Sequence, residues 1–196
     1  MMLMKKIEAL KVRTANSAKE SNGAKEIIKD KEIINDKEKN TAEEKSNDFT
    51  VRTMTIDDYE GVYALWKTIK GFSMRSIDDS FDGVKRFLSR NPATSIVAEA
   101  DGKIVGAILC GHDGRRATFY HVCVAESFRK RGIGKAMVVL AMQALKKEKI
   151  NKVALIAFTQ NDVGNAFWKG IGWKERLDLN YYDFTLNSEN IEKFNE

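Results

Sequence analysis

The sequence has few cysteines and no long apolar run, and these two features limit the class of protein to which it can belong. Cys110 and Cys123 are the only cysteines, and both lie in apolar strand-like runs, where a free thiol behaves as a small hydrophobic group. Without a disulfide framework we expect a reducing compartment. No apolar stretch reaches the ~18 residues of a membrane span, and the first residues lack the apolar core and cleavage site of a secretory signal. We therefore expect a cytoplasmic protein with no membrane partner.

Residues 1–48 contain no aromatic side chain and no proline. They hold 11 Lys or Arg and 10 Asp or Glu, so this segment is nearly neutral. Its sparse apolar residues cannot bury enough surface to offset the entropy that ordering would cost. We predict a charged extension over 1–48, disordered or partly helical. An amphipathic arm that contacts a partner or a membrane surface is the alternative.

The remaining residues, 49–196, form one predicted domain. Hydrophobic residues make up 43% of the chain, enough for a core. The net charge of +5 is compatible with anionic ligands, but it is too weak and too mixed to indicate nucleic acid, and we expect no nucleic-acid partner.

Apolar periodicity and turn residues predict the order of elements in this domain. Two Asp-Gly pairs, at 101–102 and 113–114, separate strand-like runs and indicate a three-strand meander. We predict strands over 49–52, 95–100, 104–110, 118–124 and 153–158, one that begins at 173 and one over 181–186; the predicted helices cover 55–71, 77–89, 136–147 and 161–169.

A basic, glycine-containing turn follows the third strand of the meander and precedes a helix. It reads Arg129-Lys130-Arg131-Gly132-Ile133-Gly134-Lys135. Glycines allow close approach of the backbone, and a helix N-terminus offers unpaired N–H groups and partial positive charge. The turn therefore indicates a site for a phosphate or pyrophosphate, with a plain packing turn as the alternative.

Two motifs resemble the GNAT superfamily of N-acetyltransferases. Val122-Cys123-Val124 running into Arg129–Gly134 matches the family's Q/R-x-x-G-x-G/A turn. The segment from Asn161 to Trp173 is similar to the family's N-x-x-A-x-x-F-Y-x-x-x-G-F segment. The resemblance covers about residues 49–186. It implies an α/β (α+β) GNAT-like fold, with a mixed, mostly antiparallel sheet of about seven strands and about four helices.

The resemblance also implies acetyl-CoA as co-substrate, a primary amine of a small molecule or peptide as acceptor, and no metal. The pyrophosphate would bind the turn, and the pantetheine arm would pair with the backbone of Val122 and Val124 in a gap before the next strand. Asn161 would hold the arm from the other side. The residues implied for this site are Val122, Cys123, Val124, Arg129, Lys130, Arg131, Gly132, Ile133, Gly134, Lys135, Asn161 and Trp168.

Three residues are candidates for proton transfer: Tyr120, His121 and Glu99. Histidine titrates near neutral pH, which suits a general base. Neighbours on a strand point to opposite faces, so only one of Tyr120 and His121 faces the site unless a bulge intervenes. Glu99 would act through water. The family commonly places an acidic tyrosine where this chain has Trp168, whose indole N–H is no useful acid.

The acceptor pocket is expected between the two N-terminal helices and the last strands. Its candidate lining residues are Phe72, Met74, Arg75, Asp78, Asp79, Tyr181 and Tyr182. An active N-acetyltransferase is the first hypothesis, and a domain that binds acyl-CoA as a sensor or scaffold without turnover is the alternative. A homodimer stays open.

Overall fold

A computed structural model describes residues 49–196, and the extension predicted over 1–48 lies outside the described residues. Across 49–196, no helix combines the length and the apolar character needed to cross a membrane. In chain order the elements are β1 (Thr50–Thr53), the 3-10 helix η1 (Ile56–Asp58), α2 (Tyr59–Lys67), β2 (Ser73–Arg75), α3 (Phe81–Arg90), β3 (Ile96–Ala100), β4 (Lys103–His112), β5 (Ala117–Val124), the 3-10 helix η2 (Glu126–Phe128), α4 (Ile133–Lys147), β6 (Val153–Leu155), α5 (Asp162–Gly170) and β7 (Glu192–Phe194).

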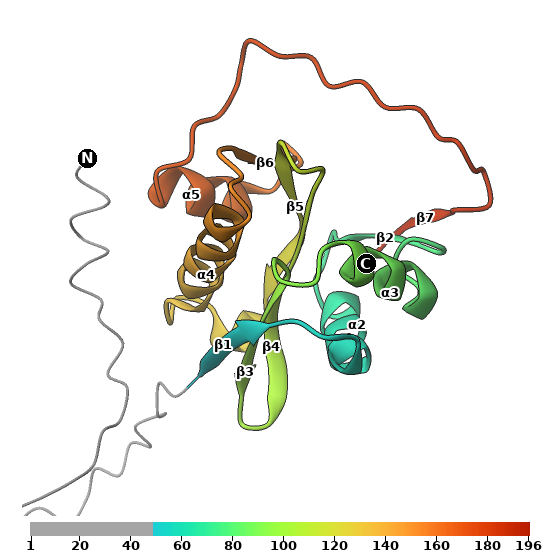
Figure 1. Ribbon diagram of the computed structural model, residues 1–196. Coiled ribbons are helices and arrows are strands. Elements are labelled where there is room, and N and C mark those ends of the chain that lie inside the picture. Colours follow the sequence, from blue (N-terminus) through green and yellow to red (C-terminus); the bar gives the residue numbers. More distant parts are fainter. Residues whose placement is uncertain (1–48) are drawn as a thin grey trace, which may run out of the picture. The chain divides into compact units, whose positions relative to one another are not determined.

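Five of the seven described strands form the main sheet, in the order β1-β3-β4-β5-β6 (Figure 1). The first four pair antiparallel, and β6 joins β5 in parallel after the helical crossover of α4. The remaining two strands, β2 and β7, form a separate antiparallel pair. The mixed, mostly antiparallel sheet and the four α-helices predicted from the sequence are thus confirmed.

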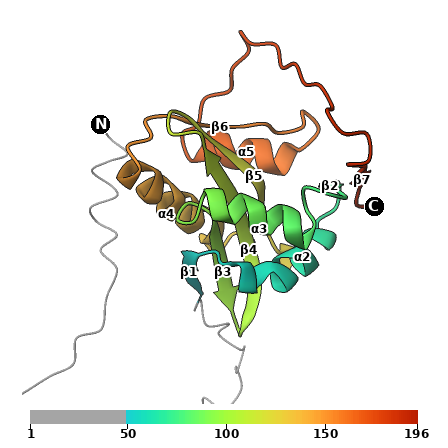
Figure 2. The same ribbon diagram turned by 45° about the vertical axis from the view of Figure 1, so that its right-hand side comes forward.

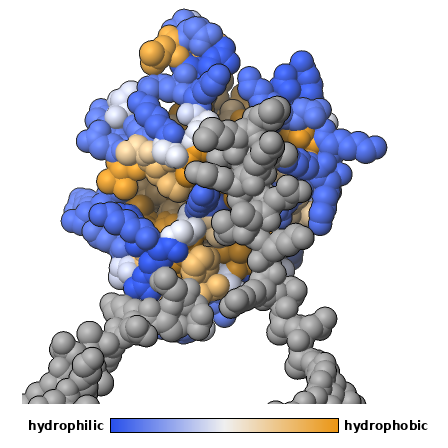
Figure 3. Space-filling model, turned by 90° about the vertical axis from the view of Figure 1, so that its left-hand side faces the viewer, coloured by the Kyte–Doolittle hydropathy of each residue, from blue (hydrophilic) through white to orange (hydrophobic). Residues whose placement is uncertain are grey.

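The main sheet separates two apolar cores. Alternate residues of β3 divide between them, as a pleated strand requires: Ile96 and Ala98 pack in the core with α4, and Val97 packs in the core with α2 and α3. Figures 1 and 2 show α4 on one side of the sheet and α2 and α3 on the other. Seen from the side of α4 and α5, apolar side chains gather between hydrophilic ones (Figure 3).

Close approach of α4 to the sheet depends on a glycine. A Cβ atom at Gly106 of β4 would lie 2.8 Å from Met137 Cε of α4, closer than carbon atoms approach. Met137 is fully buried. The helix that follows the basic turn is therefore held firmly against the centre of the sheet.

An ion pair connects the start of the first helix to β1. Asp58 Oδ2 accepts a hydrogen bond from Thr55 N–H at 2.8 Å, which closes a capping box around η1. Arg52 of β1 donates two hydrogen bonds to the Asp58 carboxylate, at 2.6 and 2.8 Å. This bidentate pair fixes α2 over the edge of the sheet.

The second helix begins later than predicted. We expected it from residue 77, but α3 starts at Phe81, and the side chain of Ser80 caps it by accepting from Gly83 N–H at 3.1 Å. The reason lies far away in the sequence, because Asn190 Oδ1 accepts from the backbone N–H groups of Ile77 and Asp78. These bonds hold residues 77–79 in a turn.

The prediction of the last two strands is wrong. No strand begins at Trp173, and residues 181–186 belong to no sheet. A strand needs a partner for its backbone groups, and no segment of the described chain supplies one here. The strand that does form is β7, and it pairs with β2.

We expect Asp58→Asn to lower the free energy of unfolding by about 1–3 kcal/mol, because it removes the charged acceptor of Arg52. Burial by itself would raise the pKa of Asp58, but hydrogen bonds from Arg52 and Thr55 lower it below its usual range. The stabilisation is therefore present above the ordinary aspartate pKa of about 3.9 and is lost as the pH falls through the lower folded value. Urea unfolding measures it, and Asp57→Asn, at an exposed neighbour, is the control. Equal effects of the two variants would contradict the assignment.

Candidate active site

A cleft of about 1840 Å³ runs along β5. The start of α4, one side of α5, the chain after β6, the loop after α2 and part of α3 also line it. Among its lining residues are Val122, Cys123, Val124, Arg129, Lys130, Gly132, Ile133, Gly134, Lys135, Asn161 and Trp168, all predicted from the sequence. Of that predicted set, only Arg131 does not line the cleft. Its guanidinium lies over the ring of Phe128, 4.7 Å from the centroid.

The cleft opens where the pairing of two strands ends. Parallel pairing of β5 with β6 covers three residue pairs and stops at Phe119 and Leu155. Past these pairs, residues 120–124 and 156–158 all line the cleft. Among residues 49–196, no strand therefore lies beside β5 over 120–124 on the β6 side, and an extended ligand can pair with such an edge.

The basic turn leaves backbone donors at the start of α4. Gly132 occupies the N-cap in the left-handed region, at φ 85°, and carries no capping side chain. The helix's first hydrogen bond runs from Ala136 N–H to Gly132 O at 3.0 Å. Within the described chain, the N–H groups of residues 133–135 find no acceptor. The turn thus offers three donors and partial positive charge beside basic side chains, which fits an anionic diphosphate.

A bulge changes which side chains of β5 reach the cleft. Leu109 pairs with Tyr120 and Ala107 with Cys123, so β5 carries one more residue than β4 between these pairs. His121 lies in this bulge with φ 50°, a left-handed value that costs about 1–3 kcal/mol away from glycine. Tyr120 and His121 consequently both line the cleft.

The imidazole of His121 is held by a buried carboxylate. His121 Nε2–H donates to Asp79 Oδ1 at 2.6 Å, and the side chains are 19% and 6% exposed. The other oxygen, Asp79 Oδ2, accepts from Arg75 N–H at 2.6 Å. Because a carboxylate accepts, Nε2 is the donor of this pair and Nδ1 is the ring nitrogen left for a second partner. The hydrogen bond therefore fixes the orientation of the imidazole.

Aromatic rings enclose the same imidazole. The ring centroid of Trp66 lies 4.7 Å from that of His121, and the centroid of Phe72 lies 4.8 Å away. Tyr59 fixes the backbone next to the carboxylate by donating to Asp79 O at 3.0 Å. The imidazole is thus fixed in position by packing as well as by its hydrogen bond.

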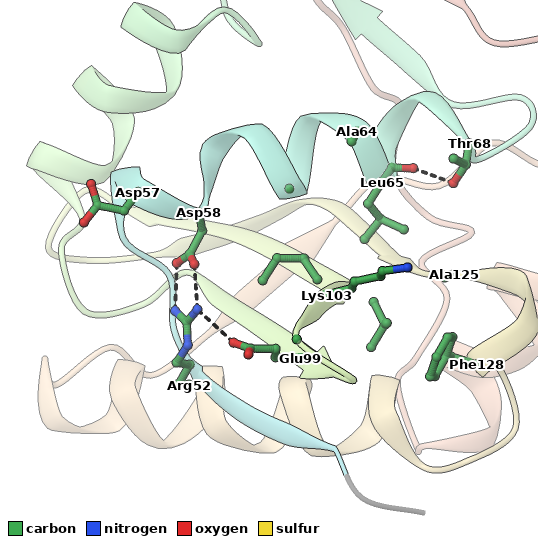
Figure 4. A pocket seen from close by; sticks show the side chains of 14 residues that line it. Arg52, Asp57, Asp58, Ala64, Leu65, Thr68, Glu99, Lys103, Ala125 and Phe128 are labelled. Carbon is green, nitrogen blue, oxygen red and sulfur yellow. Dashed lines mark hydrogen bonds and ion pairs between the residues drawn. The ribbon is translucent and has the colours of Figure 1, made fainter. Parts of the chain in front are cut away.

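Glu99 lies outside the cleft. Its carboxylate accepts from Arg52 at 3.2 Å, and it lines a separate hollow of about 600 Å³ next to α2 (Figure 4). Figure 4 shows Arg52 between Asp58 and Glu99, bonded to both. The structure therefore does not bring Glu99 together with Tyr120 and His121.

Two predicted ligand residues also have structural roles. Asn161 Oδ1 caps α5 by accepting from Gly164 N–H at 2.9 Å. The indole of Trp168 packs against Phe167 and Trp173, with centroid distances of 5.0 and 4.7 Å. Both residues line the cleft while stabilising its wall.

The residues expected to bind the acceptor divide into two groups. Phe72, Arg75, Asp78 and Asp79 line the cleft. Met74, Tyr181 and Tyr182 do not, and both tyrosines are largely exposed on a segment that the sequence assigned to a last strand. The two acids are already bonded, Asp79 to His121 and Asp78 to Asn190.

Sequence reasoning missed the partner of His121. The sequence led us to name Asp79 only as a candidate for the acceptor pocket, and it lies 42 residues before His121 in the chain. No local pattern joins two such distant positions, and the bulge that turns His121 toward Asp79 has no glycine to mark it.

Comparison with known proteins identifies the family to which the domain belongs. A family model described as Acetyltransferase (GNAT) family matches residues 58–173. An acetyltransferase from Pectobacterium atrosepticum is 32% identical over 143 residues, which are 72% of this chain and 96% of that protein. Together these similarities define an acetyltransferase. The chain belongs to the GNAT family and is an acetyl-CoA-dependent acyltransferase.

Solved structures share the fold. The PaiA N-acetyltransferase from Thermoplasma acidophilum, in complex with coenzyme A, aligns with a TM-score of 0.56 at 18% identity, over 65% of this chain and 90% of that one. The aminoglycoside acetyltransferase AAC(6')-Iy, in complex with a CoA-acetylneamine bisubstrate analogue, aligns with a TM-score of 0.54 at 18% identity, over 70% of this chain and 99% of that one.

We expect Gly132→Asp to weaken CoA binding by about tenfold or more, a loss of at least ~1.4 kcal/mol, because a carboxylate would lie beside the free donors of the turn. Gly114→Asp is a matched control, because Gly114 has the same φ of 85° and equally open surroundings but lies at the tip of a hairpin. Calorimetry with CoA measures both variants. Equal affinity of the two variants would show that the turn is not the diphosphate site.

Proposed function

We propose that the protein transfers the acetyl group of acetyl-CoA directly to a primary amine of a small molecule or peptide, with His121 as general base and Asp79 as the residue that orients it. The observation that carries this proposal is the 2.6 Å hydrogen bond between the two side chains in the cleft along β5. The AAC(6')-Iy complex, whose analogue joins CoA to an amine-bearing ligand, supports an amine acceptor.

CoA is proposed to lie along the cleft, with its diphosphate on the N–H groups of residues 133–135. The side chains of Arg129, Lys130 and Lys135 line the same end and supply charge-assisted contacts. The pantetheine arm would pair with the free backbone edge of β5 over 120–124. This position leads the thioester toward the bulge, where His121 lies.

The chemistry asks three things of the protein. The acceptor must lose a proton, because only a neutral amine attacks the thioester carbonyl; the nitrogen–carbon bond then forms and the carbon–sulfur bond breaks. His121 Nδ1, the ring nitrogen that does not bond to Asp79, is proposed to take that proton. Backbone N–H groups of the bulged strand can stabilise the oxyanion, and holding both substrates in one cleft supplies much of the rate.

The thiolate that departs needs a proton, and this chain has Trp168 at the position where the family commonly has a tyrosine acid. Tyr120 is the other proton-transfer candidate in the cleft; its phenol is about half exposed and its ring lies edge-on to Phe87. Glu99 has no part in the proposal because Arg52 holds it elsewhere. Family membership and the oriented imidazole favour turnover over a domain that only binds acyl-CoA.

We expect His121→Gln to lower kcat/KM by a factor of about 10²–10⁴, because the amine loses its base. We expect Asp79→Asn to lower kcat/KM as well. Release of free thiol from acetyl-CoA, measured over a panel of polyamines, amino acids, aminoglycosides and peptides, finds the acceptor and gives the rate. His112→Gln, which changes the only other histidine, is the control and should keep the wild-type rate. Full activity of a folded His121→Gln protein would overturn the assignment, and CoA binding without thiol release on any acceptor would overturn the enzyme proposal for that panel.

We expect Cys123→Ala and Cys110→Ala to keep acetyl transfer within about threefold of wild type, because transfer is direct. Burial raises the pKa of Cys123 to about 12 and that of Cys110 to about 11, so neither thiol is a nucleophile near neutral pH. Mass spectrometry after incubation with acetyl-CoA alone should show no acetylated cysteine. An acetylated Cys123 together with an inactive, folded Cys123→Ala protein would indicate a covalent intermediate instead.

A further inference from the structure

Basic side chains line the cleft on the wall that is proposed to face the acceptor, well away in sequence from the basic turn. Lys70, Arg75, Arg86 and Arg90 belong to this wall, which consists of the lining residues between 68 and 90. They come from the loop after α2, from β2 and from α3. Positive charge is unexpected here, because an amine acceptor is itself a cation before it loses its proton. The charge therefore needs a partner other than the amine.

The acids of the cleft do not supply that partner. Asp78 and Asp79 are the carboxylates of this wall, and they already bond to Asn190 and His121 respectively. The third acid that lines the cleft within residues 49–196 is Glu126, which lies in η2, just before the basic turn.

Two guanidinium groups of this wall have no carboxylate partner in the described part of the chain. Arg75 pairs with Glu192 at 3.2 Å, but no ion pair among residues 49–196 involves Arg86 or Arg90. Both belong to α3, are exposed and line the cleft. Because they are four residues apart on a helix, their side chains lie on one face and can bind a single group together.

The helix that carries these two side chains is held firmly against the sheet (Figure 2). A Cβ atom at Gly111 of β4 would lie 2.9 Å from Phe87 Cζ, so the ring of Phe87 packs directly on the strand. At the end of α3, Asn91 Oδ1 accepts from His112 N–H at 2.8 Å. The position of Arg86 and Arg90 is therefore set by the fold.

Phe87 also places these guanidinium groups close to the proposed base. Its ring lies edge-on to that of Tyr120, with the centroids 6.0 Å apart. Tyr120 precedes His121 in the bulge of β5, and all three residues line the cleft. Arg86 and Arg90 flank Phe87 in sequence and on the helix, so they lie beside the acceptor's path to the imidazole.

We propose that the acceptor is an amine that also carries an anionic group, a carboxylate or a phosphate, which Arg86 and Arg90 bind while the amino group lies at His121. This inference rests on the proposed amine transfer and names the class of its substrate. The planar donors of a guanidinium match pairs of carboxylate or phosphate oxygens. A polycation, such as a polyamine or an aminoglycoside, would instead be repelled by the same side chains.

Matched pairs of acceptors test the charge preference. Thiol release from acetyl-CoA is compared between L-amino acids and their carboxamides, and between O-phosphoethanolamine and ethanolamine. We expect kcat/KM to be about tenfold or more higher for the anionic member of at least one type of pair, and that type tells carboxylate from phosphate. Equal rates within both types of pair, or the highest rate with a polyamine, would overturn the proposal.

Variants of α3 assign the preference to its two arginines. The double variant Arg86→Gln, Arg90→Gln should abolish the preference by raising KM for the anionic member about ten- to a hundredfold. Lys85→Gln is the matched control and should keep the preference. It removes one charge from the same helix, but the Lys85 ammonium lies over the ring of Phe81, 5.9 Å from its centroid, and does not line the cleft. A folded double variant, checked by circular dichroism, that keeps the preference would contradict the assignment.

Failure of this inference differs from failure of amine transfer. Thiol release without any charge preference overturns the anion site and leaves transfer to an amine intact. If no amine releases thiol, transfer fails, and calorimetry of the same anionic amines on the CoA complex decides the anion site. Binding that the double variant abolishes would support the site, and no binding to the wild type would overturn it.

Discussion

Parallel pairing between β5 and β6 ends at Phe119 and Leu155, and the cleft begins there. If the pairing continued, the β6 side of β5 would be filled by a neighbouring strand, and no ligand could pair with residues 120–124. Because it stops, an extended edge runs from the bulge of β5 toward the basic turn at the start of α4. The free donors of that turn and the free edge of β5 form one continuous surface that suits a diphosphate followed by an extended arm.

The bulge in β5 brings the proposed base to this surface. One extra residue places His121 in a left-handed conformation. In this conformation the imidazole forms its hydrogen bond with Asp79. The core formed by α2 and α3 therefore does more than stabilise the domain, because Trp66 and Phe72 pack against the imidazole of the proposed base. The strain at His121 is offset by these contacts, and it is the kind of strain that accumulates at functional sites.

Local signals in the sequence were enough for much of this. The Asp-Gly turns predicted the meander, and all but Arg131 of the run from Arg129 to Lys135, for which we predicted an anion site, lines the cleft. The features that sequence reasoning missed depend on distant partners. Asp79 bonds to His121, which is 42 residues away in the sequence. Asn190 accepts a hydrogen bond from the backbone of the turn before α3, and Arg52 bonds to Glu99 outside the cleft. Residues 181–186 have the pattern of a strand, but a pattern cannot say where its partner is.

The central claim is that His121 takes the proton of an amine beside the free edge of β5. The most direct measurement is a crystal structure of the protein with a bisubstrate analogue in which CoA is joined to a primary alkyl amine. The account predicts the amine nitrogen at about 2.6–3.2 Å from the imidazole of His121, or one water away. It also predicts the diphosphate on the N–H groups of residues 133–135. An amine nitrogen placed away from His121, with the diphosphate still on the turn, would contradict the account.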